Sequence, residues 1–197
     1  MKRVSRIAAT ALVMLPGAAL AHTGHGEASG FTHGLMHPFG GVDHVLAMVA
    51  VGLYAAMLGG RALWLVPAAF IVAMAAGAAF GETGYPLPYA EVGVALSVAL
   101  LGFAVALRVS LPALAAMALA SLFAIFHGHA HGTEMPVDAA GIAYGAGFVA
   151  ATALLHATGI ALGIGTERLG SAWSARASRL AGGVMAAAGA GLLAGVI

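Results

Sequence analysis

The chain has 197 residues, of which 61% are hydrophobic and only 8% are charged, and its mean hydropathy is +0.99. A soluble domain of this size carries about 25% charged residues, so the composition excludes a separate soluble domain and predicts an all-α polytopic membrane protein. The net charge of +1 provides no basic surface for nucleic-acid phosphates. The absence of cysteine excludes disulfides, thiolate zinc sites and iron–sulfur clusters.

The first 21 residues are typical of a cleavable signal peptide. Three basic side chains precede or begin the apolar run 7–15, and residues 19–21, with the sequence ALA, match the small-residue pattern at which signal peptides are cleaved. An uncleaved first span is the alternative, but the run is short for a span and the Pro-Gly pair after it favours cleavage. We therefore expect residues 1–21 to be removed and the mature chain to begin at His22.

A short His- and Gly-rich segment, residues 22–41, is expected to follow the signal on the periplasmic side. In it, His22 and His25 would open the mature chain as HTGHGE. The free terminal amine and the imidazole of His22 could together chelate a divalent cation. A flexible polar tail without a ligand role is the alternative.

Residues 42–197 predict a bundle of six transmembrane helices, because apolar stretches near 20 residues recur between short connections. The expected spans cover residues 42–59, 62–80, 89–107, 111–127, 139–163 and 180–197. Glycines in the last two spans have small-xxx-small spacing, which lets helices approach closely in lipid. That spacing also permits a homo-oligomer, but packing within one chain is the favoured interpretation.

The charged residues provide an independent test of this topology. With a cleaved signal and six spans, all eight Lys and Arg residues fall on the cytoplasmic side, as the positive-inside rule requires. The outer side receives Glu27, Glu82, Glu134 and Asp138 and no basic residue. A miscount by one span would invert this pattern. We therefore expect the protein in the bacterial cytoplasmic (inner) membrane, with the mature N-terminus in the periplasm.

Two short strings gather imidazole and carboxylate groups at the outer boundary of the membrane. The first, HPFGGVDH, runs from His37 to His44 and leads into the first span, and its Pro38 suits a first helical turn. Asp43 could bind a metal ion directly, or it could orient an imidazole by accepting a hydrogen bond from the other ring nitrogen. Ionisable groups within a span are costly and usually functional, so this string predicts a metal site rather than packing.

The second string, FHGHAHGTE, covers residues 126–134 at the outer end of the fourth span. In a helix, His127, His131 and Glu134 fall on one face and His129 points to the opposite face. In an extended segment, which the two glycines of the string would permit, the three histidines would share a face instead. Both conformations bring at least two imidazoles together.

Imidazole nitrogen and carboxylate oxygen without thiolate suit Ni²⁺, Co²⁺, Zn²⁺, Mn²⁺ or Cu²⁺ and disfavour Cu⁺. Two isolated residues are further candidate ligands. His156, deep in the fifth span, could coordinate an ion on its way inward or be a hydrogen-bonded core residue, and Glu91 lies just inside the third span. Ser97 and Thr158 could line the same path, but a hydroxyl bonded to its own helix backbone is the more common arrangement.

The two strings together resemble the signatures of a known family. His37 and the pair Asp43-His44 give H-x₅-D-H, and residues 126–134 match F-H-G-x-A-H-G-x-E. Both are similar to the HupE/UreJ family of secondary nickel permeases, small bacterial proteins that supply nickel for hydrogenase and urease. This resemblance implies a set of metal residues that consists of His37, Asp43, His44, His127, His131 and Glu134.

We therefore expect a transporter rather than an enzyme, with Ni²⁺ or Co²⁺ as the transported ion and with no permanently bound cofactor. Its partners would be the divalent ion and the lipid bilayer. The ion would be captured outside, partly dehydrated between the first and fourth spans, and passed inward near His156. The sequence lacks G-x-x-x-x-G-K-[ST], so the chain does not hydrolyse ATP itself. The alternative is an intramembrane zinc-dependent hydrolase that uses the same His/Asp cluster to activate water.

Overall fold

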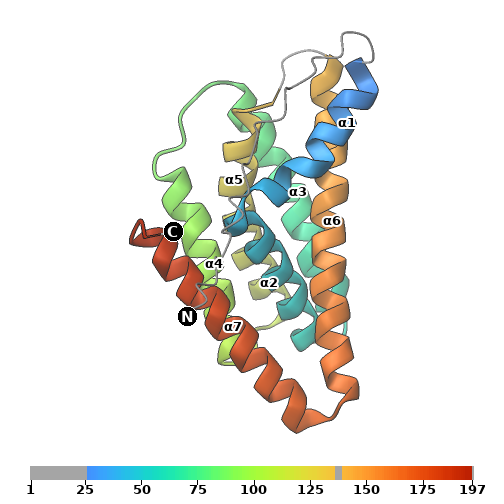
Figure 1. Ribbon diagram of the computed structural model, residues 1–197, viewed down its shortest axis with the longest axis vertical. Coiled ribbons are helices and arrows are strands. Elements are labelled where there is room, and N and C mark those ends of the chain that lie inside the picture. Colours follow the sequence, from blue (N-terminus) through green and yellow to red (C-terminus); the bar gives the residue numbers. More distant parts are fainter. Residues whose placement is uncertain (1–25, 136–138, 197) are drawn as a thin grey trace, which may run out of the picture.

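The structure, a computed structural model, describes residues 26–135 and 139–196, and all regular elements within these ranges are helices (Figure 1). In chain order they are α1 (Gly26–Met36), the 3₁₀ helix η1 (His37–Gly40), α2 (Val42–Leu58), α3 (Ala62–Glu82), α4 (Ala90–Ala106), α5 (Ala113–Gly132), α6 (Ala139–Arg168) and α7 (Ser171–Leu193). The predicted all-α fold is confirmed. The predicted signal peptide, residues 1–21, lies outside the described residues, as do His22, His25 and Asp138.

Three of the described helices are long and apolar enough to cross a membrane, namely α3, α5 and, from Gly141 onward, α6. They contain 21, 20 and 28 residues respectively, and a helix needs about 20 residues to cross roughly 30 Å of hydrocarbon. A fourth crossing results if the bent pair formed by residues 30–40 and α2 counts as one broken span. The helices thus have the length and composition of a membrane protein, and the number of six spans stays a prediction.

The two ends of the bundle carry opposite charge. The connections α2–α3, α4–α5 and α6–α7 lie at its lower end in Figure 1, and the α3–α4 connection lies at its upper end. Arg61 and Arg108 belong to the first two of these lower connections, and Arg168 ends α6 beside Glu167, the one described acidic residue at this end. Glu82 ends α3 at the upper end, and Glu134 follows the end of α5. This separation is the one that the predicted topology requires.

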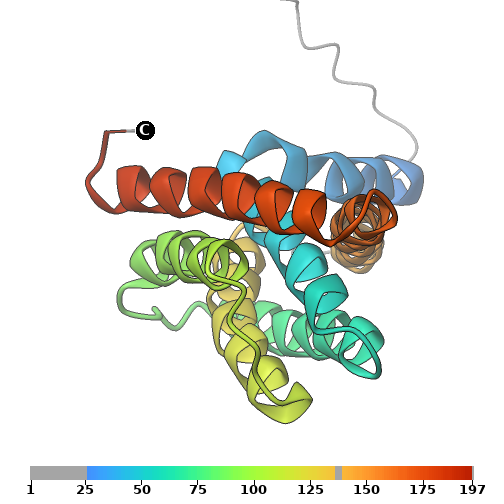
Figure 2. The ribbon, with the colours of Figure 1, turned by 90° about the horizontal axis from the view of Figure 1, so that it is seen from below.

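Close helix pairs build the bundle, with the most extensive packing of α3 on α5, α4 on α7, and both α1 and α2 on α6. Seen from below, α7 lies across one side of the bundle beside α4 (Figure 2). α5 approaches α3 so closely that a Cβ atom on Gly128 would collide with the backbone carbonyl of Met74. Two glycines of the predicted small-xxx-small runs, Gly147 and Gly189, pack in the same way on α1 and α4. These two therefore serve contacts within the chain, as expected.

Residues 22–41, expected to be a short hydrophilic segment, contain a helix that the hydropathy pattern did not predict. α1 packs along α6, where Gly34 lies directly against the backbone carbonyl of Tyr144. Glycine weakens an isolated helix, but here it permits this close approach, and the packing on α6 stabilises the helix. The chain then bends by 87° between residues 30–40 and α2. As a result, α2 begins part-way along the bundle rather than at its end (Figure 1).

Candidate metal centre

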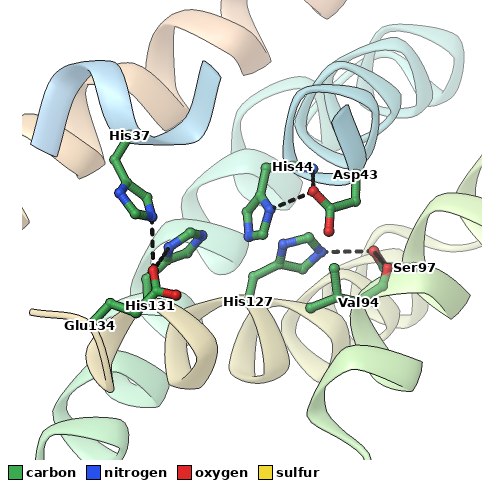
Figure 3. A network of polar contacts seen from close by, with 8 residues as sticks. All are labelled: His37, Asp43, His44, Val94, Ser97, His127, His131 and Glu134. Carbon is green, nitrogen blue, oxygen red and sulfur yellow. Dashed lines mark hydrogen bonds and ion pairs between the residues drawn. The ribbon is translucent and has the colours of Figure 1, made fainter. Parts of the chain in front are cut away.

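The two His-rich strings meet in the interior of the bundle (Figure 3). The first string contributes His37 from η1 and His44 from the first turn of α2, and the second contributes His127 and His131 from the last turns of α5. The ring centroids of His44 and His131 lie 4.1 Å apart, and those of His44 and His127 lie 4.6 Å apart. The centroids of His37 and His131 lie 4.8 Å apart. Four imidazoles from three elements thus form one cluster.

The second string is helical, which decides between its two predicted conformations. α5 continues to Gly132, beyond the predicted end of the fourth span at residue 127, and Glu134 follows in the turn after the helix. Figure 3 shows His127, His131 and Glu134 along one side of α5, facing the first string. The extended alternative is therefore wrong. The hydropathy pattern ended the span too early because the final helical turns bury histidines instead of apolar side chains.

His129 lies outside the cluster, on the opposite side of α5. Its Nε2 atom donates a hydrogen bond of 2.9 Å to the backbone carbonyl of Tyr85, and its ring lies 5.4 Å from that of Phe80. The bond ties the end of α5 to the connection between α3 and α4. The candidate ligand His129 thus has one ring nitrogen in a contact that positions the helix, while its Nδ1 is buried without a hydrogen-bond partner among the described residues.

Asp43 fixes the orientation of the His44 ring. One carboxylate oxygen of Asp43, Oδ1, accepts hydrogen bonds from the backbone N–H of His44 at 2.8 Å and from its Nδ1 at 2.9 Å. Because Nδ1 carries the hydrogen, the lone pair of the neutral ring is on Nε2. That atom is buried and has no hydrogen-bond partner among the described residues. The sequence left two roles open for Asp43, direct binding of a metal ion and orientation of an imidazole. The geometry supports the second role.

Ser97 performs the same task for His127. The Ser97 hydroxyl donates to the backbone carbonyl of Val94 at 2.6 Å, so its oxygen is left to accept from Nε2 of His127 at 2.8 Å. The lone pair of the His127 ring is then on Nδ1, which is also buried without a partner within residues 26–135 and 139–196. The expected bond of Ser97 to its own helix is confirmed, and it determines the direction of the second bond.

His131 lies at the centre of the cluster and is the least constrained of the rings. Neither of its nitrogens has a hydrogen bond in the described part of the chain. Its Nδ1 lies 3.9 Å from Oε2 of Glu134, and the same oxygen lies 3.0 Å from Nε2 of His37. Ligand atoms of these three residues all lie within 4.8 Å of one another. A single divalent cation could therefore contact all three after small side-chain rotations.

A cavity of about 530 Å³ connects this cluster to solvent, and its lining includes His33, His37, Asp43, His44, His131 and Glu134. The donors become more buried along it. The side chain of Glu134 is 60% exposed, that of His37 is 26% exposed and that of His131 is 9% exposed, while His127 is fully buried. The cluster thus extends from the surface into the core of the bundle.

His33 is a lining residue that the sequence reasoning missed. It is exposed on α1, one turn before His37, and the two ring centroids lie 6.2 Å apart. The ring of Tyr144 from α6 packs on both, at 5.6 Å from His33 and 5.5 Å from His37. The i, i+4 spacing of the two histidines was the available signal. This spacing places two side chains on one face only if the segment is helical, and residues 22–41 were not expected to form a helix.

The remaining candidates lie outside the cluster. Glu91 is exposed at the start of α4 and lines a separate cavity of about 370 Å³, to which Asp43 also contributes. Thr158 is exposed and donates to the backbone carbonyl of Leu154 at 2.8 Å, which is the expected bond to its own helix. His156 is buried deeper in the bundle, on α6.

The fold and the site define a class, an all-helical membrane protein whose interior holds clustered imidazole and carboxylate groups of the kind that ligate borderline divalent cations. The family model described as HupE / UreJ protein matches residues 10–192. The chain is also 47% identical to the Protein HupE of Rhizobium leguminosarum bv. viciae over 194 residues, which is 98% of this chain and 100% of that protein. The chain therefore belongs to the HupE/UreJ family.

This family is associated with nickel and cobalt uptake and with hydrogenase and urease. The resemblance drawn from the two strings is thus confirmed at the level of the family. No solved structure gives a significant match to the chain.

Proposed function

We propose that the chain is a secondary transporter that moves Ni²⁺, with Co²⁺ as a second cargo, from the periplasm into the cytoplasm. The observation that carries this proposal is the meeting of His37, His44 and His131 with Glu134 around one cavity that opens to solvent, with His127 buried behind them against His44. The ion is the cargo and not a resident cofactor. Inside the cell it would supply metalloenzymes such as hydrogenase or urease.

The geometry suits capture and partial dehydration of a cation. The two outermost groups, Glu134 and His37, keep contact with water and can exchange ligands with a hydrated ion. The deeper nitrogens of His44 and His127 are buried, unpartnered and held in a fixed tautomer by Asp43 and Ser97. Such outer partners raise the basicity of an imidazole ligand and fix its direction. An ion that moves inward therefore exchanges water for imidazole nitrogen.

The ligand chemistry also guides the choice of metal. Imidazole with carboxylate, and no thiolate, suits Ni²⁺ and Co²⁺ equally well, so the cluster by itself does not separate the two. We give Ni²⁺ priority because the family is associated with nickel enzymes. Neither the family match nor the relative supports the alternative of an intramembrane hydrolase.

We further propose six membrane spans, α2 to α7, with the end of the bundle that carries Glu82 and Glu134 in the periplasm. α2 and α4 have 17 residues each, which is at the lower limit for a span, and the bend before α2 lets α1 and η1 fill the space above it. Because the chain has no cysteine, single-cysteine labelling can test this arrangement. A membrane-impermeant maleimide should label Tyr85→Cys from the periplasm but not Ser110→Cys. Labelling of Ser110→Cys alone would invert the topology.

Uptake of radiolabelled Ni²⁺ into cells that express the chain tests the function directly. Replacement of the central ligand in His131→Ala, or of the orienting carboxylate in Asp43→Ala, should reduce uptake by about 10-fold or more. His129→Gln is the matched control, because His129 is equally buried on the same helix but faces away from the cluster. Unchanged uptake in both His131→Ala and Asp43→Ala would refute the proposal. Competition by unlabelled Co²⁺ would show whether the two ions share the route.

A further inference from the structure

His156 is a buried imidazole that the outer cluster does not use. It lies on α6 with only 2% of its surface exposed, and neither ring nitrogen has a hydrogen-bond partner within the described ranges. Buried polar atoms are rarely left unpaired, because the loss of their hydrogen bonds to water costs free energy. The sequence left open that His156 is a core residue held by a hydrogen bond, but the described residues provide no such bond. An unpaired lone pair at this depth calls for a ligand.

The groups next to His156 do not supply that ligand. Thr152 lies one turn earlier on α6, but its hydroxyl donates to the backbone carbonyl of Phe148 at 3.0 Å and faces the Met74 sulfur at 3.7 Å. The ring that packs on His156 is that of Phe70, perpendicular to it at a centroid distance of 5.1 Å. Phe70 is fully buried and offers no polar atom. The imidazole thus lies in an apolar setting beside one aromatic ring.

Phe70 also touches the deepest residue of the outer cluster. Its ring centroid lies 5.8 Å from that of His127, whose Nδ1 atom is likewise buried and unpartnered. One apolar ring from α3 is therefore in contact with an unpaired imidazole on each of two other helices, α5 and α6. No other described residue has ring contacts with both His127 and His156.

We propose that His156 is an inner binding station for the transported divalent cation and that Phe70 is the barrier between it and the outer cluster. This inference rests on the proposed function. An ion at His127 would pass the face of the Phe70 ring, which attracts cations, and would then be bound by His156. A station with a single imidazole holds an ion more weakly than a cluster of four. Weak inner binding favours onward release, which conduction requires.

The test separates binding from transport in the purified full-length chain. Co²⁺ serves as the probe for binding, by its visible absorption in detergent, and Ni²⁺ uptake into proteoliposomes reports transport. His156→Ala should bind Co²⁺ at the outer cluster as the unmodified chain does, while its uptake should fall by about 10-fold or more, as for loss of a metal ligand. Thr152→Val is the matched control, because it removes a buried hydroxyl one turn away and should transport normally.

Two outcomes would overturn the inference. Uptake by His156→Ala at the unmodified rate would show that the ion does not need this imidazole. A parallel loss of Co²⁺ binding and uptake would show that His156 supports the outer cluster instead. If the unmodified chain itself neither binds Co²⁺ nor takes up Ni²⁺, the proposed function fails. This result can be distinguished from the two outcomes for His156→Ala, in which the unmodified chain is active.

Phe70 provides a second test that does not depend on the His156 variant folding. In Phe70→Leu the barrier is smaller and more flexible, so Ni²⁺ loaded into proteoliposomes should leak out several-fold faster than through the unmodified chain. Phe70→Trp, with a larger ring, should bind Co²⁺ at the outer cluster but take up Ni²⁺ more slowly. Equal leak and uptake rates in all three proteins would show that Phe70 is not the barrier.

Discussion

The two halves of the cluster are built in different ways. The histidines of the second string lie on α5, a continuous helix that places His127 and His131 one turn apart and whose backbone is in contact with α3 through Gly128. The first string runs from η1 into α2 through Gly40 and Gly41, across a bend of 87°. One half is thus a fixed row of ligands, and the other is a joint between two helices.

This difference indicates which half can move. A continuous helix packed backbone to backbone on its neighbour keeps its ligands at constant spacing and depth. A joint can change its angle through φ and ψ rotations at a few residues, which is how hinges in other proteins work. We therefore expect α5 to be the fixed wall of the ion path. Capture and release would then depend on small movements of His37 and His44 relative to α5.

The largest effect is expected from a substitution that displaces the fixed half. Gly128→Ala places a Cβ atom against the Met74 carbonyl, so α5 must move away from α3. Overpacking of this kind costs about 1–3 kcal/mol of stability. Thermal unfolding of the purified protein should show a clear decrease in Tm, together with loss of Co²⁺ binding. Gly165→Ala on α6 is the control, because a Cβ there has no atom within 4 Å. Equal Tm values for the two variants would contradict the fixed-wall interpretation.

A smaller and more local effect is expected at the joint. A Cβ on Gly41 would lie 2.6 Å from Oδ1 of Asp43 and 3.1 Å from Nδ1 of His44, so Gly41→Ala should separate this hydrogen-bonded pair. The backbone of Gly41, with φ −112° and ψ 118°, is an ordinary extended conformation that alanine also adopts. We expect Co²⁺ affinity in an equilibrium titration to fall by about 10-fold, as for loss of an orienting partner, with little change in Tm.

The neighbouring glycine provides the control for the joint. A Cβ on Gly40 would meet no atom within 4 Å, although Gly40 belongs to the same connection and lines the same cavity. Gly40→Ala should therefore bind Co²⁺ as the unmodified chain does. If Gly40→Ala and Gly41→Ala lost affinity equally, the effect would come from general stiffening of the joint and not from the Asp43–His44 pair.

The same contrast explains how much of the molecule could be predicted from its sequence. The positions of α2 to α4 and the start of α5 followed from hydropathy, because each apolar run is a helix with its own internal hydrogen bonds. The face shared by His127 and His131 followed from helical spacing once α5 was taken as continuous. These features depend on local sequence. They were therefore accessible without knowledge of any neighbouring helix.

The joint depends instead on contacts between distant residues, and there the prediction was incomplete. α1 is stabilised by the approach of Gly34 to Tyr144 on α6, more than a hundred positions along the chain, and its own composition is that of a polar Gly-rich segment. For the same reason, the partnership of Ser97 with His127 could not be inferred, since it joins α4 to α5. His33 was missed because its role requires α1 to be a helix that packs beside the cavity.

The smallest effect is expected from a substitution of His33. It would distinguish residues that only make first contact with the hydrated ion from residues of the inner cluster that bind it. His33 is exposed, and its ring is farther from His37 than the rings of the inner cluster are from one another, so it can meet a hydrated ion but cannot enclose one. His33→Ala should raise the half-saturating Ni²⁺ concentration a few-fold and leave the maximal uptake rate unchanged. Met36→Ala, on the same helix and lining the same cavity, should change neither quantity. A loss of maximal rate in His33→Ala would mean instead that His33 is a ligand of the metal cluster. The movable half of the cluster would then include the last turn of α1 as well as η1 and the start of α2.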